Sequence, residues 1–285
     1  MIKLGLIGYP VSHSLSPVIH TAALQSCGLI GEYSLFPIHT DDTEGLKDLL
    51  DHVRTGEIHG LNVTIPHKQN VMPFLDELSS TANVIGAVNT IYKQGPKLVG
   101  DNTDAAGFLS DLKRFLTEET QRHRGSRALV LGAGGSARAV VYALLNDGWE
   151  VTIAARRLGQ AQQLADSFAN CKSRIASCQL LDLGHKDPLL STLSLIVNTT
   201  PVGMTPNIDQ SPWPESLPFP ASAAIYDLVY NPRETRLVRD ACAHGRPATT
   251  GLGMLIEQAT LAFELWTGHK PSRQVMLEAA NQTTH

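Results

Sequence analysis

The stretch that most constrains the fold runs from Ala128 to Ala139 and reads ALVLGAGGSARA. Four apolar residues, a length that suits a buried strand, lead through three closely spaced glycines into a segment rich in Ala, Val and Leu that favours a helix. A strand, a glycine turn and a helix in this order form a phosphate site, because the first N–H groups of the helix and its dipole both attract an anion. We therefore predict that this loop binds the pyrophosphate of a dinucleotide. Its binding residues are Gly132, Ala133, Gly134, Gly135, Ser136 and Ala137.

The residues after the next strand bear on which dinucleotide binds. Glu150 to Ala154 reads as that strand, and Arg156 and Arg157 follow it. They stand about 20 residues beyond the glycines, where proteins that bind NAD place an acid for the ribose 2′-hydroxyl. Two cations and no carboxylate suit the 2′-phosphate of NADP instead, so we predict NADP as the cofactor. The alternative, which the residues alone leave open, is a solvated pair of arginines at the start of a helix.

Size and charge exclude several classes of protein. The chain has 285 residues, of which 42% are hydrophobic and 18% charged, and this suits two globular domains of ordinary size. The net charge of −4 offers no basic field for a nucleic acid, and no apolar run approaches the roughly 18 residues that span a membrane. The N-terminus begins like a strand and lacks the features of a signal peptide. We therefore expect a cytoplasmic protein with neither a nucleic-acid nor a membrane partner.

The cysteines and histidines do not follow metal-binding patterns. The four cysteines show no CxxC pair and no zinc spacing, which is typical of reduced thiols in a cytosolic protein. The eleven histidines lack the i,i+4 spacing of a metal-binding helix, so we predict no metal site. The cysteines are Cys27, Cys171, Cys178 and Cys242.

Hydrophobic periodicity predicts strands and helices that alternate along the chain. In the first part we expect three helices, with Ser16, Thr43 and Asp104 as their N-caps. Residues 117–127 read as a surface loop, and the proline-rich residues 206–220 as an irregular loop. From the glycine loop to about residue 230, alternation at this spacing implies a parallel sheet with crossover helices. The expected strands are 2–7, 33–38, 61–65, 88–92, 97–99, 128–131, 151–154, 179–181, 195–198 and 224–230, and further helices cover 158–169, 254–267 and 272–281.

Polar residues gather at the strand ends and loops of the first part, within residues 12–16, 62–68, 89–90 and 102–104. In an open parallel sheet, ligands bind beyond the carboxyl ends of the strands. Hydroxyls and amides with one Lys and one Asp suit a small polyhydroxylated acid, with Lys68 and Asp104 handling protons. The alternative is that these are caps, turn residues and a solvated lysine, and the residues alone favour neither interpretation.

Eight segments, in order and from end to end, resemble the shikimate dehydrogenase family. The resemblance implies an α/β fold with two domains. Residues 1–104 and 252–285 would form a substrate-binding and catalytic domain completed by the C-terminal helices, and residues 105–251 a Rossmann-type NADP-binding domain, with the active site in the cleft and domain closure expected. The segments are GYPVSHSLSPVIH (8–20), NVTIPHK (62–68), GAVNT (86–90), GDNTDAAG (100–107), LGAGGSARA (131–139), VNTTPVGM (197–204), YDLVYNPRETRL (226–237) and GLGMLIEQATLAFELWTG (251–268).

The resemblance also implies roles for individual residues. Lys68 corresponds to the catalytic lysine of the family and Asp104 to its carboxylate partner. The chain departs from the family at Ala155-Arg156-Arg157, where the family has Asn-Arg-Thr, so two donors to the 2′-phosphate are missing while an arginine remains. The implied substrate ligands are Ser14, Ser16, Asn62, Thr64, Asn89, Tyr230 and Gln258. The implied cofactor residues are the glycine loop (132–137), Arg156, Arg157, Thr199, Thr200, Met204, Gly251 and Met254.

The activity that the resemblance implies is the reversible, NADP-dependent reduction of 3-dehydroshikimate to shikimate, a step of aromatic amino acid biosynthesis through chorismate. We expect a small-molecule substrate and a monomer or homodimer. Three alternatives stay open. A quinate/shikimate dehydrogenase that uses NAD or both cofactors is disfavoured by the two serines and the missing acid, and a non-catalytic sensor by the presence of Lys68 and Asp104. An oxidoreductase with an unrelated substrate would leave residues 62–68 and 102–104 unexplained.

Overall fold

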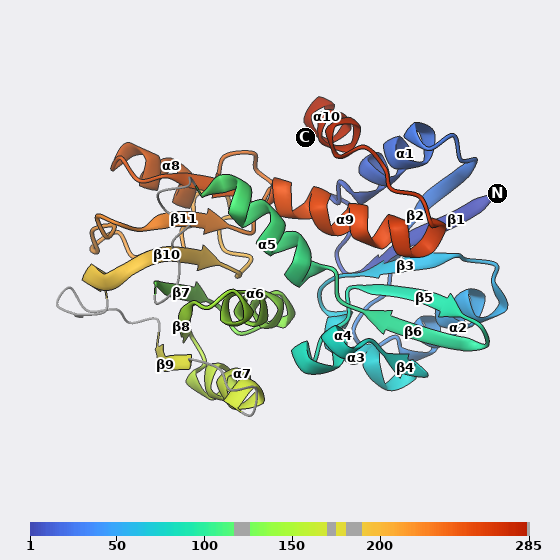
Figure 1. Cartoon of the computed structure of the whole chain (residues 1–285), viewed down its shortest axis with the longest axis horizontal. Helices are drawn as coiled ribbons and strands as arrows, with labels where there is room; N and C mark the ends of the chain where they lie inside the picture. Colours follow the sequence, from blue (N-terminus) through green and yellow to red (C-terminus); the bar gives the residue numbers. More distant parts are fainter. Residues whose placement is uncertain (117–125, 170–174, 181–189, 284–285) are drawn as a thin grey trace. The chain divides into compact units, whose positions relative to one another are not determined.

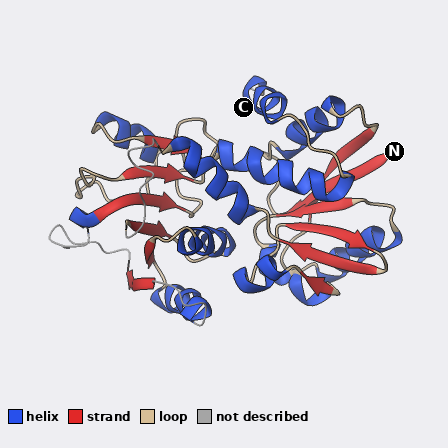
Figure 2. Cartoon of the chain, in the orientation of Figure 1, coloured by secondary structure: helices blue, strands red, loops and turns tan. Residues whose placement is uncertain are grey.

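The structure is a computed structural model, and it describes residues 1–116, 126–169, 175–180 and 190–283. The chain forms two compact units, Met1–Gly107 with Leu255–His285 and Phe108–Met254. Each unit contains a six-stranded sheet with helices packed on it (Figure 1; Figure 2). The boundaries follow Gly107 and Met254, compared with residues 104 and 251 in the expectation from the sequence. Most of the surface loop expected at residues 117–127 lies outside the described residues.

The first sheet is mixed. Its strand order is β2-β1-β3-β5-β6-β4, in which β1 runs parallel to β2 and β3, while β5 is antiparallel to both β3 and β6. The elements are β1 (Ile2–Gly8), α1 (Ser16–Ser26), β2 (Gly31–Pro37), α2 (Thr43–Thr55), β3 (Gly60–Val63), α3 (His67–Asn70), η1 (Met72–Phe74), β4 (Glu77–Leu78), α4 (Ser80–Ile85), β5 (Thr90–Gln94), β6 (Lys97–Asp101), α5 (Asp104–Phe115), α9 (Leu252–Thr267) and α10 (Arg273–Gln282), with α5 and α9 crossing from one unit to the other.

The two faces of the first sheet follow from the two-residue repeat of its strands. In β3, Leu61 and Val63 join the apolar side chains of α2 in one buried core. Gly60 and Asn62 point to the opposite face, where α1 and α9 pack (Figure 1). A Cβ at position 60 would lie 2.1 Å from the indole of Trp266, so only glycine lets α9 approach β3 this closely.

His20 of α1 is enclosed by aromatic rings on this second face. Its imidazole stacks on Tyr33, with ring centroids 4.5 Å apart and planes 1° from parallel, and it also contacts the rings of Phe263 and Trp266. Burial lowers the pKa of His20 from 6.5 to about 3, and the neighbouring Asn62 side chain opposes this shift. The ring is therefore neutral in the folded protein at neutral pH.

The second sheet is parallel throughout, with strand order β12-β11-β10-β7-β8-β9. Read from the other edge, this is the doubly wound 3-2-1-4-5-6 order, which binds dinucleotides where the order reverses, here between β7 and β10. The elements are β7 (Arg127–Leu131), α6 (Gly135–Asn146), β8 (Glu150–Ala155), α7 (Leu158–Ala169), β9 (Ile175–Leu180), η2 (Leu190–Thr192), β10 (Leu193–Asn198), β11 (Ala224–Asp227), α8 (Arg236–Ala243) and β12 (Ala248–Thr250).

The proline-rich segment 206–220 is irregular, as predicted, yet part of it is core. Trp213 and Leu217 are each 4% exposed and pack with Leu237 and Ala241 of α8 against the sheet. The Trp213 indole N–H donates to the carbonyl of Leu217 at 3.1 Å. The segment therefore covers one face of the second sheet in place of a regular helix.

Three predicted helix caps are wrong by one residue, and one of them, Asp104, is the first residue of α5. Ser16 is the first residue of α1 rather than its N-cap, which is Leu15, and the hydroxyl of Ser14 accepts from the Ser16 N–H at 3.2 Å. Thr43 is likewise the first residue of α2, because the Asp42 carboxylate accepts from the Gly45 N–H at 2.9 Å. At Ser16 and Thr43 a neighbouring side chain with the same capping ability stands one or two residues earlier.

The first testable prediction concerns stability in acid. Because the unfolded chain binds a proton at His20 that the folded protein does not, the contribution of His20 to the free energy of unfolding should fall as pH drops below about 6.5, by up to about 1.4 kcal/mol per unit down to about pH 4. The stability of His20→Leu relative to the wild type, from urea unfolding, should therefore increase as pH falls over this range. The exposed His13→Gln should retain the wild-type slope, and an unchanged slope in His20→Leu would contradict the prediction.

Candidate active site

A buried ion pair, Lys68 with Asp104, lies at one edge of the first sheet. Lys68 belongs to the short helix α3 that follows β3, and Asp104 is the first residue of α5, where the helix dipole favours a carboxylate. The ammonium Nζ lies 2.6 Å from Asp104 Oδ2, and the two residues are 9% and 5% exposed. Burying both charges costs free energy unless their remaining lone pairs and protons find partners, which makes the surrounding groups part of the site.

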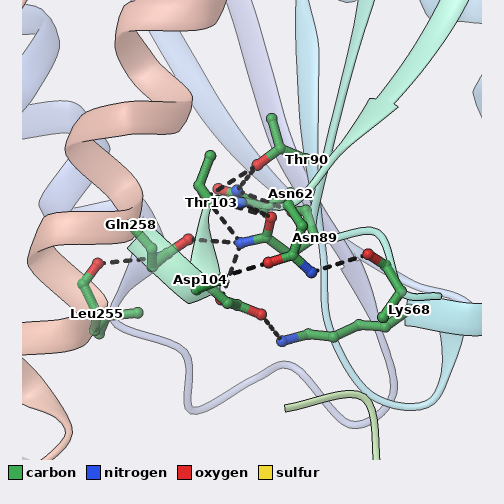
Figure 3. A network of polar contacts seen from close by, with 11 residues as sticks. Asn62, Lys68, Asn89, Thr90, Thr103, Asp104, Leu255 and Gln258 are labelled. Atoms are coloured by element: carbon green, nitrogen blue, oxygen red, sulfur yellow. Dashed lines mark hydrogen bonds and ion pairs between the residues drawn. The ribbon is translucent and has the colours of Figure 1, made fainter. Parts of the chain in front are cut away.

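Those partners are arranged around the side chain of Asn89 (Figure 3). Its amide nitrogen Nδ2 lies 2.9 Å from Asp104 Oδ1, 2.9 Å from Thr103 Oγ1 and 3.2 Å from Gln258 Oε1. Its oxygen accepts from the Thr103 N–H at 2.7 Å. Asp104 is thus held at both carboxylate oxygens, by Lys68 on one and by Asn89 on the other.

A second amide, that of Asn62 at the end of β3, holds the backbone of Asn89. Its Nδ2 donates to the Asn89 carbonyl at 3.2 Å and to Thr90 Oγ1 at 3.3 Å. Gln258, on α9, is itself oriented by a bond from its Nε2 to the Leu255 carbonyl at 2.9 Å. Five of the predicted residues are therefore in one hydrogen-bonded network, which Thr90 and Thr103 complete (Figure 3). The five are Asn62, Lys68, Asn89, Asp104 and Gln258.

The predicted residues Ser14, Ser16 and Thr64 lie in or near the loops at the same edge of the sheet. The Ser14 hydroxyl donates to Ser16 Oγ at 3.1 Å. The two loops that carry these residues are joined, because the Tyr9 N–H donates to the Ile65 carbonyl at 3.0 Å. Hydroxyls, amides, an ammonium and a carboxylate therefore gather beyond the ends of β1 and β3, which suits a ligand with several hydroxyl groups.

In the second unit, the glycine loop joins β7 to α6. Gly132 has a φ of +115°, and a Cβ there would lie 2.6 Å from Thr199 Oγ1. Gly134 is the N-cap of α6 and has no side chain to occupy the helix N–H groups, and a Cβ there would meet none of the described atoms within 4 Å. Ala137 is fully buried, where a small residue lets helix and sheet pack closely. These features fit a pyrophosphate bound at the helix N-terminus.

The end of β10 forms the other side of the strand-order reversal. Both the N–H and the hydroxyl of Thr199 donate to the Leu131 carbonyl, at 2.9 and 2.7 Å, so this loop is tied to the end of β7. Behind it, Asn198 Oδ1 accepts from the N–H and hydroxyl of Thr200, at 2.9 and 2.7 Å. The amide nitrogen of Asn198 donates to Asp227 Oδ1 at 2.8 Å.

The fully buried Asp227 anchors this region. Besides the bond from Asn198, its carboxylate accepts from the Val229 N–H at 3.0 Å and from the Thr235 hydroxyl at 2.7 Å. Burial raises the pKa of Asp227 from 3.8 to about 6, against the opposing effect of these hydrogen bonds. Asp227 and Asn198 stand inside segments recognised in the sequence, but no role was assigned to them there.

The remaining predicted residues also belong to the second unit. Arg156 and Arg157 are exposed directly after β8, Met204 is 43% exposed, and Met254 is buried in the first turn of α9. A Cβ at Gly251 would lie 2.3 Å from the Leu228 carbonyl, so a close backbone approach explains this glycine. Tyr230 lies in this unit too, whereas the other predicted substrate ligands lie in the first.

The part of the chain that the structure describes contains neither of two other kinds of site. Among those residues, no helix combines the length and apolarity that a membrane crossing requires. The same residues contain no group of three or more His, Cys, Asp or Glu side chains arranged to hold a metal ion. Cys27 and Cys242 are free thiols, while Cys171 and the side chain of Cys178 lie outside the described part.

The fold and site together define a class: a two-unit α/β protein with a Rossmann-type dinucleotide unit and a buried lysine–carboxylate pair in the other unit. Family models identify it further, as "Shikimate dehydrogenase substrate binding domain" at residues 6–91, "Shikimate / quinate 5-dehydrogenase" at residues 115–195 and "Shikimate 5'-dehydrogenase C-terminal domain" at residues 251–280. The chain belongs to the shikimate dehydrogenase family, and the predicted family and α/β fold class are confirmed.

Individual relatives match along almost the whole chain. Shikimate dehydrogenase (NADP(+)) of Carboxydothermus hydrogenoformans is 41% identical over 275 residues, which cover 96% of this chain and 95% of the relative. The structure of shikimate 5-dehydrogenase from Thermus thermophilus with NADP(H) and shikimate is 40% identical, with a TM-score of 0.85 and 99% of each chain covered. Quinate dehydrogenase from Corynebacterium glutamicum with NAD is 33% identical, with a TM-score of 0.87 and 99% of each chain covered.

The second testable prediction follows from the burial of Asp227. Because its pKa is higher in the folded protein than in the unfolded chain, the contribution of Asp227 to the free energy of unfolding should fall as pH rises from about 4 to 6, by up to about 3 kcal/mol in all. Asp227→Asn keeps the shape but cannot ionise. Its stability relative to the wild type, from urea unfolding, should therefore increase over this pH range. The exposed Asp209→Asn serves as control, and a pH-independent difference for Asp227→Asn would show that Asp227 ionises normally.

Proposed function

We propose that this protein is an NADP-dependent shikimate dehydrogenase that catalyses the reversible reduction of 3-dehydroshikimate to shikimate, on the route to chorismate and the aromatic amino acids. The observation that carries the proposal is the buried Lys68–Asp104 pair within its amide and hydroxyl network. Relatives with NADP(+) in their names, and a related structure that holds NADP(H) and shikimate, support it.

The two units divide the work in this proposal. The first unit would bind the substrate and carry out proton transfer, because it holds the ion pair and the polar loops. The second would bind NADP through the glycine loop, with Arg156 and Arg157 as partners of the 2′-phosphate. NADPH, when bound, supplies the hydride that reduces the ring carbonyl.

The chain's own residues would handle the proton. As hydride arrives, the carbonyl oxygen of the substrate gains negative charge, and a positioned acid must protonate it. The Lys68 ammonium is the donor we assign, since its charge also stabilises the developing alkoxide. Asp104 holds the ammonium in place and keeps unshared lone pairs for a ring hydroxyl, while Asn89 fixes the carboxylate so that neither group has to reorganise.

The polar loops and amides would set the substrate's position. Ser14 and Ser16 suit a carboxylate or hydroxyl, because their paired hydroxyls lie 3.1 Å apart and can turn outward to donate. Thr64 and Gln258 extend the same edge, on the loop after β3 and on α9. Tyr230, from the second unit, is assigned to the substrate by resemblance.

A quinate dehydrogenase that uses NAD is the alternative that a specific observation favours, because such an enzyme matches this chain with a TM-score of 0.87. The residues after β8 argue for NADP, since an NAD enzyme of this fold places an acid there and this chain has two exposed arginines. The ratio of kcat/KM for NADP and NAD, measured with shikimate and with quinate, decides between the two.

The cellular setting and assembly complete the proposal. We assign the protein to the cytoplasm, which the free thiols Cys27 and Cys242 support. It would act as a monomer or a homodimer, and light scattering of the purified protein distinguishes the two.

The third testable prediction concerns the loss of the proposed proton donor, Lys68. Lys68→Ala should lower kcat for shikimate oxidation by at least about 100-fold with little change in KM, because the ammonium acts mainly in the transition state. Lys97→Ala provides the matched control, since Lys97 forms an exposed ion pair with Glu77 in the same unit. A near-normal kcat for Lys68→Ala would remove Lys68 from this role.

The fourth testable prediction concerns the cofactor. Replacing Arg156 and Arg157 together by Gln should lower the NADP-to-NAD ratio of kcat/KM by at least about tenfold, because hydrogen bonds to a charged phosphate are among the strong ones. Arg239→Gln, an exposed position of the same unit, should leave the ratio unchanged. If the double variant keeps the wild-type preference, other residues read the 2′-phosphate.

A further inference from the structure

Tyr33 is a buried residue that reaches the active-site network from a distant strand. It lies in β2, and its side chain crosses β1 to reach Asn62 in β3, where its hydroxyl donates to Asn62 Oδ1 at 2.8 Å. Both residues are nearly inaccessible to solvent, with Tyr33 8% and Asn62 5% exposed. In such surroundings, an amide oxygen left without a donor would cost about 1–3 kcal/mol.

The bond from Tyr33 decides which way the Asn62 amide faces. With its oxygen held by the Tyr33 hydroxyl, Asn62 must direct its Nδ2 at the Asn89 carbonyl, 3.2 Å away, and at Thr90 Oγ1, 3.3 Å away. Both N–H groups of Asn62 therefore have acceptors inside the protein, so its amide nitrogen supports the site rather than the substrate.

The groups that Asn62 holds lead directly to the catalytic carboxylate. Residues 89 and 90 are adjacent, and fixing the carbonyl of one and the hydroxyl of the other fixes the backbone from which the Asn89 side chain projects. That side chain donates to Asp104 Oδ1 at 2.9 Å, and Asp104 in turn holds Lys68 at 2.6 Å (Figure 3). A change in the orientation of the Asn62 amide would therefore shift the ion pair through two hydrogen bonds.

The ring of Tyr33 is held as firmly as its hydroxyl. His20 stacks on it almost face to face at 4.5 Å, and the rings of Phe263 and Trp266 of α9 also contact His20. Trp266 is itself fixed by a hydrogen bond from its indole N–H to the Ile91 carbonyl at 3.1 Å. The hydroxyl of Tyr33 is therefore aimed at Asn62 before any substrate arrives.

We propose that Tyr33 is a positioning residue of the active site, whose hydroxyl orients the Asn62 amide and thereby aligns Asn89 on Asp104. It touches neither substrate nor cofactor in this role. The inference rests on the proposed dehydrogenase activity and adds to it a group outside the segments by which the family resemblance was established.

Tyr33→Phe removes the hydroxyl and leaves the stacked ring. In steady-state shikimate oxidation with NADP, kcat should fall about tenfold, the effect of losing one hydrogen bond that counts in the transition state, while KM for NADP stays unchanged. Tyr92→Phe is the matched control, because Tyr92 lies in β5 of the same sheet and pairs with Gly60, close to Asn62. A purely structural role for Tyr33 would lower the melting temperature and leave kcat intact well below it.

A double-mutant cycle separates action through Asn62 from action elsewhere. Asn62→Ala should lower kcat at least as much as Tyr33→Phe, and adding Tyr33→Phe to it should have no further effect. If Tyr33→Phe does not fold, Asn62→Ala alone tests whether the amide that Tyr33 orients is needed for turnover. If the wild type turns over and Tyr33→Phe has the wild-type kcat, the positioning role is overturned. It is overturned likewise if the effects of the two substitutions on kcat simply multiply. In both cases the proposed dehydrogenase activity stands. No turnover by the wild type would overturn both.

Discussion

The interaction on which the rest of the first unit depends is a pair of opposite charges held out of water. Lys68 and Asp104 attract each other strongly at 2.6 Å, but removing both from solvent costs several kcal/mol per ion before any partner is counted. The surrounding groups offset that cost. The Asn89 amide nitrogen donates to the second carboxylate oxygen. Thr103 and Gln258 hold the Asn89 side chain in turn, and Asn62 donates to the Asn89 backbone carbonyl. A pair maintained in this way is preorganised for a reaction in which charge moves onto a nearby oxygen.

The sheet explains why residues so far apart in the chain meet. The side chains of the network come from α3, β3, α9, and the starts of β5 and α5, all close to one edge. The mixed topology contributes, because the antiparallel β5 begins beside the end of β3 and so presents Asn89 and Thr90 to Asn62. The second unit applies the same rule with parallel strands only, where the glycine loop and the Thr199 loop meet at the reversal of strand order.

Prediction from the sequence succeeded where the signal is local and stopped where it depends on register. Gly132 to Ala137 could be predicted as a glycine turn that leads into a helix, because strand, turn and helix follow one another within a dozen residues. Spacing alone left the ion pair undecided, since 36 positions separate its partners, and only the family resemblance singled it out. Tyr33 could not be predicted because its contact with Asn62 passes over a whole strand. The prediction of Ser16 as an N-cap is wrong because the helix already includes Ser16, whose N–H donates to the Ser14 hydroxyl. Periodicity indicates neither the antiparallel direction of β5 nor the burial of Trp213.

The first unit is discontinuous in the chain, and this has a consequence for its synthesis. A ribosome delivers the strands of its sheet first, then the whole second unit, and only afterwards α9 with Phe263, Trp266 and Gln258. Until α9 emerges, the nascent first unit lacks the helix that covers Gly60 and closes the aromatic surround of His20. The second unit is contiguous in the chain, so all of it is synthesised while the first unit still exposes the apolar face that α9 will cover.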